Sequence, residues 1–206
     1  MKAWADFHPY VLPDVPGCPE PMLDQALRET ARDFCTRTKA WAEWMDPLTA
    51  SSARALYEFE PDAGTEVVAA LAATVGEDGY AVIGAQALPA AWQDGKQGCV
   101  KDKTLIHVSS KEFILYPAPS AGQRITLQLA LRPTMAGTGV GDVIFDEFAE
   151  AIAAGAKAKL MARPRKEWTD LQSAAMYGME FERRVTLAAN KDWHQSAQQR
   201  VSKAAL

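Results

Sequence analysis

The chain has few cysteines and no long apolar run. Cys18, Cys35 and Cys99 have unrelated neighbours and no paired spacing, so neither a disulfide framework nor a zinc site is expected. No stretch of about 18 apolar residues could span a bilayer, and no basic segment followed by an apolar one stands at the N-terminus, as it would in a signal peptide. These absences predict a protein of the cytoplasm that has reduced thiols and does not enter a membrane.

A convincing set of catalytic residues is also missing. His8, His107 and His194 have no metal ligand at a suitable spacing, and the chain has no nucleophile elbow or Walker phosphate loop. Residues 137–142 are glycine-rich, but Asp142 stands where a dinucleotide fingerprint needs glycine, and its carboxylate would repel a pyrophosphate. We therefore predict no catalytic, metal-binding or cofactor-binding residue. An enzyme that uses a nucleotide or another small ligand at residues 137–142 is the alternative from a different class.

A strong positive charge is absent too. The 206 residues have a formal net charge of −4, which argues against a dedicated nucleic-acid-binding protein. The charge is unevenly distributed, with 12 Lys/Arg against 21 Asp/Glu in residues 1–150 and 10 against 5 in residues 151–206. Such asymmetry is typical of surfaces that meet different partners, although helices that happen to be basic would explain it equally well.

The N-terminal 50 residues combine a proline-rich segment with a helix. Five prolines between Trp4 and Pro21 exclude a regular helix there, and the aromatic residues among them predict an extended arm that lies on an apolar surface. Pro21 then opens an amphipathic helix, because apolar residues recur at steps of three and four from Leu23 to Met45. Pro47 ends this pattern.

The middle of the chain has the pattern of β-strands. Between Ser51 and Pro133, apolar residues recur with period two, and turn sequences rich in glycine and proline separate the runs. Residues 84–103 fit this pattern poorly, and a short helix is expected around 88–92. The pattern predicts a β-rich subdomain over residues 51–134.

Two helices are expected in the last third. The first follows Asp142 and stops at Pro164, and its alanines and glycine give it a nearly smooth face that another helix can approach closely. The second covers about residues 170–189, and residues 191–206 have too little apolar content for a core of their own. The residues expected in the helix–helix contact are Ala151, Gly155, Ala158, Gly178 and Phe181.

Aromatic and charged residues near both ends are the candidates for contact with another subunit or a partner, because aromatic side chains on such segments often anchor in partner surfaces. They are Trp193, Arg200, Val201 and Lys203 in the C-terminal segment and Trp4, Phe7 and Tyr10 in the proline-rich arm.

Three segments form a combination that spans most of the chain. The proline-rich arm leads into the helix over residues 27–41. Residues 113–119 end in Pro117-Ala-Pro119, and after a turn the strand over residues 125–133 follows. The Ala/Gly-rich helix over residues 151–160 precedes Pro164, Trp168 and Phe181. Together these segments resemble the head-to-tail adaptor proteins of tailed bacteriophages, which are also called connector or neck proteins.

The resemblance implies an α+β fold in which one N-terminal and two C-terminal helices form a bundle with an inserted β-rich subdomain. The corresponding domains are residues 1–50 (arm and first helix), 51–134 (β-rich subdomain), 135–190 (two bundle helices) and 191–206 (C-terminal arm).

For function, the resemblance implies a structural virion protein without cofactors. A homo-oligomeric ring of about twelve copies would dock on the portal protein and join it to a tail or nozzle protein. Its channel would pass genomic DNA without sequence-specific contact, and the acidic part of the chain is a candidate for the channel wall. Such a ring assembles in the cytoplasm of the bacterial host and belongs to the neck of the virion. Another tail-completion protein is the alternative within the same class.

Overall fold

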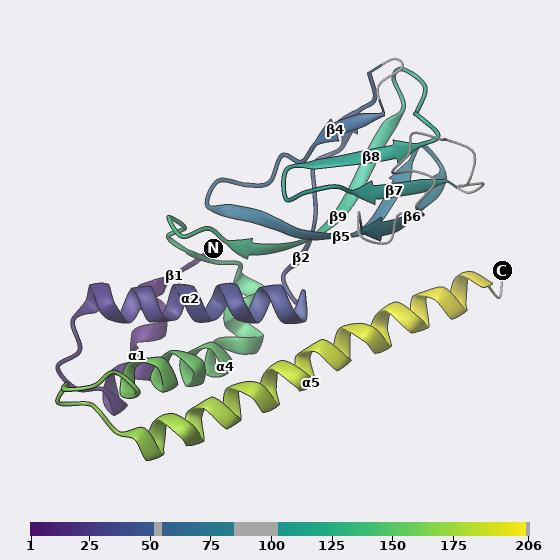
Figure 1. Ribbon diagram of the computed structural model, residues 1–206. Helices are drawn as coiled ribbons and strands as arrows, with labels where there is room; N and C mark the ends of the chain where they lie inside the picture. Colours follow the sequence, from purple (N-terminus) through teal and green to yellow (C-terminus); the bar gives the residue numbers. More distant parts are fainter. Residues whose placement is uncertain (52–54, 85–102, 205–206) are drawn as a thin grey trace, which may run out of the picture. The chain divides into compact units, whose positions relative to one another are not determined.

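The computed structural model describes residues 1–51, 55–84 and 103–204, with backbone alone for residues 191–204 (Figure 1). The fold is of the α+β class. Two compact units divide the chain: a helical unit of Met1–Trp41 with Arg132–Leu206, and a β unit of Ala42–Leu131. The predicted short helix at residues 88–92 lies outside the described residues.

Three helices pack against one another in the helical unit: α2 (Glu20–Thr38), α4 (Asp142–Met161) and α5 (Leu171–Ala204) (Figure 1). Phe34 of α2 lies at the centre, with ring centroids 5.0 Å from Phe148 of α4 and 6.5 Å from Phe181 of α5. These rings and the aliphatic residues around them form the core of the unit, since Phe34 is fully buried and Phe181 is only 7% exposed.

The prediction of an extended N-terminal arm is wrong. After the short strand β1 (Lys2–Ala3), the chain forms the helical turns η1 (Trp4–Phe7), α1 (His8–Val11) and η2 (Leu12–Asp14). Pro9 and Pro13 stand in the first turns of α1 and η2, where a helix needs no N–H donor and where the fixed φ of proline suits the helix. Short helices therefore accommodate prolines that a long helix would exclude.

The first long helix ends earlier than its apolar pattern predicts. Lys39 adopts a left-handed conformation (φ 56°, ψ 22°), and its N–H donates to the carbonyl of Cys35 at 2.9 Å, which closes α2 at Thr38. Residues beyond it form the strand β2 (Ala42–Trp44), which pairs with β9 (Arg124–Pro133). Apolar spacing alone could not reveal this boundary, because Trp41 continues the spacing of the helix and is buried although it lies beyond the helix end.

The last helix, by contrast, is longer than predicted. Its backbone continues to Ala204, well beyond residue 189. Apolar residues at steps of three and four predict a buried stripe on this helix that includes Leu171 and Ala175. Ala174, Phe181 and Val185 are buried as this spacing predicts, whereas Leu171 and Ala175 are exposed. Each residue turns the helix by about 100°, which places these two positions well to one side of the buried line.

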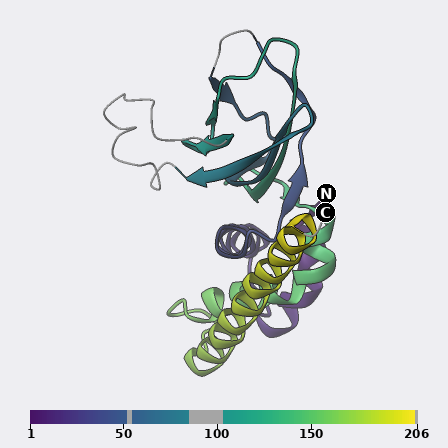
Figure 2. The same cartoon turned by 90° about the vertical axis from the view of Figure 1, so that its right-hand side faces the viewer.

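The β unit is a curled antiparallel sheet with one parallel pair (Figure 2). Its strand order is β2-β9-β5-β6-β7-β8-β4, and β3 also pairs with β9. Fully buried side chains from β7, β8 and β9 supply much of its core. The remaining strands are β3 (Leu48–Thr49), β4 (Leu56–Glu58), β5 (Thr65–Val75), β6 (Asp78–Gly84), β7 (Thr104–His107) and β8 (Glu112–Tyr116).

Candidate functional site

The glycine-rich segment before α4 has a packing role. Gly139 belongs to the two-residue strand β10 (Gly139–Val140), which pairs with β1, and a Cβ on Gly139 would overlap the carbonyl oxygen of Lys2. A Cβ on Gly141 would lie 2.8 Å from Nε1 of Trp41. Close approach of backbone and ring therefore accounts for both glycines, and nucleotide binding is not needed to explain them.

The histidines with described side chains lie in separate places. His8 Nε2 is 2.7 Å from Oδ1 of Asp24 in the helical unit, and the His107 ring packs 5.5 Å from the ring of Phe59 in the β unit. In the part of the chain that the structure describes, no group of His, Cys, Asp or Glu side chains is placed to hold a metal ion. A helix that is both long and apolar enough to cross a membrane is likewise absent from the described residues.

The three long helices α2, α4 and α5 meet closely at Gly155. A Cβ on Gly155 would lie 2.5 Å from Cγ2 of Thr30 and 2.8 Å from Cδ2 of Phe181. One turn further along, the contact between α4 and α5 is looser, because a Cβ on Gly178 would lie 4.0 Å from the Cβ of Ala158. Ala151, the remaining residue predicted for the helix–helix contact, is 1% exposed.

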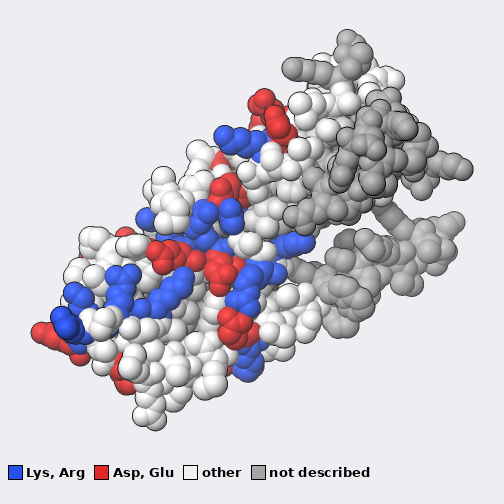
Figure 3. Space-filling view, in the orientation of Figure 1, with Lys and Arg blue, Asp and Glu red and all other residues white. Residues whose placement is uncertain are grey.

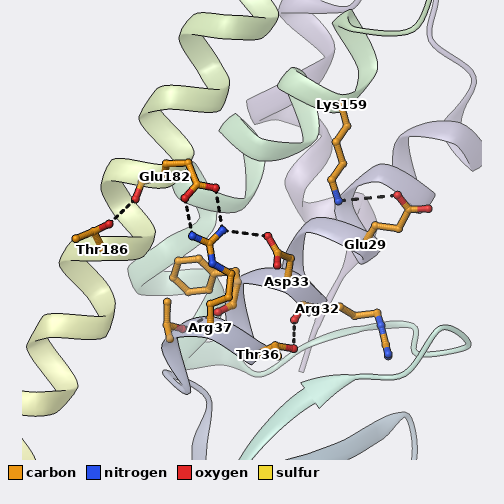
Figure 4. A network of polar contacts seen from close by, with 10 residues as sticks. Glu29, Arg32, Asp33, Thr36, Arg37, Lys159, Glu182 and Thr186 are labelled. Carbon is orange, nitrogen blue, oxygen red and sulfur yellow. Dashed lines mark hydrogen bonds and ion pairs between the residues drawn. The ribbon is translucent and has the colours of Figure 1, made fainter.

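Charged side chains connect α2 to α5 at the surface of this unit (Figure 4). Nη1 of Arg37 donates to Oε1 of Glu182 at 2.8 Å and to Oδ2 of Asp33 at 3.4 Å. Hydrogen bonds from Arg37 hold the pKa of the Glu182 carboxyl below its ordinary value. Within α5, hydrogen bonds from Arg183 and Arg184 lower the pKa of Glu180 to about 2.

These ion pairs predict an acid-sensitive contribution to stability. A carboxyl whose pKa falls from 4.5 to about 2 on folding stabilises the native state fully above pH 4.5 and ceases to do so as the pH falls through 2. We expect Glu180→Gln to lose less thermal stability than the wild type when the pH is lowered from about 5 to about 2.5. Glu77→Gln, which alters an exposed carboxyl in a turn of the β unit, is the matched control. Equal losses in all three proteins would contradict the prediction.

The outward face of α5 carries large apolar side chains. Met176 is 57% exposed, Met179 67% and Leu187 56%, and their spacing of three and then eight residues places them along one side of the helix. Acidic and basic side chains are interleaved elsewhere on the helical unit (Figure 3). We refer to Met176, Met179 and Leu187 as the α5 stripe. The sequence analysis missed it, although methionines three residues apart on a helix are a visible signal.

The predicted interface residues lie in different environments. Trp4 is 4% exposed, and its Nε1 donates to the carbonyl of Gly137 at 2.8 Å. Phe7 is fully buried, and its ring makes an edge contact with the ring of Phe145 on α4. Both side chains therefore belong to the core of their own unit, whereas Tyr10 is 41% exposed. The side chains of Trp193, Arg200, Val201 and Lys203 lie outside the described residues.

A cavity of about 250 Å³ lies in the β unit. Residues 43–48 line it from β2 and the connection to β3, residues 59–62 contribute after β4, and Leu127 and Leu129 come from β9. Every charged residue among those lining it is acidic: Glu43, Asp46, Glu60 and Asp62. Sequence reasoning could not find this site, because its lining residues come from three segments that are separated in the sequence.

Comparison with known protein families identifies a family that covers nearly the whole chain. The model of the SU10 adaptor protein family matches residues 5–203, which is nearly the whole chain. No curated protein is significantly similar to the sequence. The family match confirms the resemblance to phage head-to-tail adaptors that the sequence indicated.

Proposed function

The chain belongs to the SU10 adaptor protein family, and we propose that it forms a ring that docks on the portal protein and connects it to the tail of the virion. Adaptor proteins of phages are structural components, so the proposed task is assembly. In this proposal, three bundle helices with an inserted β-rich subdomain form each subunit, about twelve subunits close the ring, and the genomic DNA passes through its channel.

The α5 stripe is the observation that best supports the proposed ring. Three large apolar side chains that are each more than half exposed cost free energy in water, and exposed apolar side chains gathered on one side of a helix are typical of protein contacts. A ring needs a heterologous interface, in which the stripe of one subunit meets a different surface of the next. The exposed side chains of Tyr10 and Val143, on α1 and α4 of the same unit, are candidates for that second surface.

The charge of the chain supports passage of DNA without tight binding. A net charge of −4 provides no excess of Lys and Arg to neutralise phosphates, so DNA would slide past without being held. We propose that the helical unit and the C-terminal segment meet the portal and that the β unit recruits the next tail component.

Mass measurement of the purified protein, alone and with purified portal protein, tests this function. An adaptor is expected to give a complex of defined stoichiometry with portal. A monomer that does not bind portal but binds a nucleotide would instead favour the enzyme alternative. A protein that binds tail components but not portal would favour the tail-completion alternative.

A single charge in the α5 stripe is expected to prevent ring closure. Met179→Glu places a carboxylate at the centre of the proposed subunit contact, where burial without a partner is costly. The variant should add to portal in fewer copies than the wild type, as measured by native mass spectrometry. Ser110→Glu changes an exposed polar residue of the β unit, outside α5, and is the control. Full rings with Met179→Glu would exclude the stripe from the interface.

A further inference from the structure

We propose that the free edge of β2 and the adjoining cavity of the β unit bind an extended basic segment of the tail-side partner. The partner segment adds as a strand beside β2 and places a Lys or Arg side chain in the cavity. This inference rests on the proposed adaptor role, because that role supplies a protein partner on the tail side.

The backbone of β2 can accept a further strand. β2 stands at one end of the strand order, with β9 as its neighbour. The N–H of Met45 donates to the carbonyl of Leu127 at 2.9 Å, and Trp44 lies opposite Gln128. In an antiparallel pair successive residues point their N–H and C=O groups alternately toward and away from the partner strand, so the amide and carbonyl of Trp44 point away from β9. Among the described strands, none pairs with β2 on that side, and main-chain groups presented in this way are the basis of recognition by strand addition.

The cavity beside this edge suits a long cationic side chain. Leu127, Leu129 and Phe59, which are at most 7% exposed, provide an apolar base for the methylene groups. The carboxyl groups of Asp46, Glu60 and Asp62 provide the charge for the cationic end, and all three residues are exposed. Trp44, 58% exposed, offers an aromatic face to a guanidinium or ammonium group.

The charge of the whole unit favours the same class of partner. Residues 42–131 contain 11 Asp/Glu and 6 Lys/Arg, a balance of −5. Such a balance attracts a basic segment over distance, and this attraction weakens as salt increases. A partner of the opposite sign would be repelled at the same edge.

The experiment compares recruitment of the tail-side protein by full-length adaptor assembled on portal. The test variant is Asp46→Asn with Glu60→Gln and Asp62→Asn, which keeps side-chain shape and removes three charges. The control variant is Glu20→Gln with Glu77→Gln and Glu167→Gln, which removes three exposed carboxylates away from the cavity. We expect roughly tenfold or greater weakening of recruitment with the test variant, together with a reduced salt dependence, and little change with the control.

Hydrogen exchange on the wild-type assembly supplies the second measurement. Addition of the tail-side protein is expected to protect the backbone amides of Ala42 and Trp44 and of Glu60 and Asp62. Equal recruitment by both variants, or protection confined to other parts of the β unit, would overturn the inference. Protection of β2 on ring formation alone would assign the edge to a second copy of this chain, which also overturns it. Failure of the wild type to assemble on portal at all would refute the adaptor proposal itself, and the two failures are therefore distinguishable.

Discussion

Replacing Gly155 with leucine is expected to lower the free energy of unfolding by roughly 1–3 kcal/mol. The position has no room for any side chain, because even a Cβ would lie 2.5 Å from Cγ2 of Thr30 and 2.8 Å from Cδ2 of Phe181. Both neighbours are buried and belong to different helices, so neither can move without disturbing the contact of α2 or α5 with α4. Chemical denaturation with the helical signal as readout measures the effect.

Gly178 provides a matched control for this prediction. Its substitution by alanine meets only ordinary van der Waals contact, with Ala158 at 4.0 Å, and alanine is preferred over glycine inside a helix by roughly 0.5–1 kcal/mol. Gly178→Ala should therefore leave the denaturation midpoint unchanged or raise it, whereas Gly155→Ala should lower it. Midpoints that shift in the same direction for both alanine variants would show that the three-helix contact relaxes easily.

Truncation after Asn190 is expected to abolish tight binding to portal. The removed segment contains Trp193 and Val201 as apolar anchors and Lys191, Arg200 and Lys203 as charges. A buried tryptophan of the hot-spot kind contributes about 2 kcal/mol, so Trp193→Ala alone should weaken binding roughly 30-fold. The backbone of α5 is helical to Ala204, and the truncation therefore removes helical turns from the end of a long helix.

Binding of portal by the full-length protein, the truncated protein and Trp193→Ala, at low and moderate salt, measures this effect. The full-length protein and Trp193→Ala should lose affinity with salt more steeply than the truncated protein, because both retain three cationic side chains that meet an acidic surface. Equal binding by all three proteins would exclude the C-terminal segment as the docking arm. The exposed ring of Tyr10 would then be the first alternative to test.

The resemblance reached from the sequence rested on order, spacing and composition. The period of the apolar residues changes from three and four to two and back again, and this change predicts the α+β class. Alanine and glycine at Ala151 and Gly155 predict close helix contact, because only small side chains allow it. These features involve residues that are close together in the sequence, so they can be recognised without the tertiary structure.

The boundaries and the outward surfaces depended on the tertiary structure. The apolar spacing of α2 continues to Trp41, but the helix ends at Thr38, because Lys39 adopts a left-handed conformation there. The chain then forms β2, which pairs with β9. Trp4 and Phe7 looked like exposed anchors, since nothing in their own segment can cover them. Other parts of the helical unit bury them: Phe145 of α4 packs on Phe7, and Arg28 of α2 lies over the Trp4 ring.

By itself, the sequence therefore determined the class of fold, the small residues of the helix contact and the adaptor family. The tertiary structure decided which apolar side chains remain in water and which distant segments line a cavity together. The spacing of apolar residues indicates only that a side chain packs against another apolar group. That apolar group can belong to a distant part of the same chain or to another protein. Packing between elements that are far apart in the sequence decides between the two.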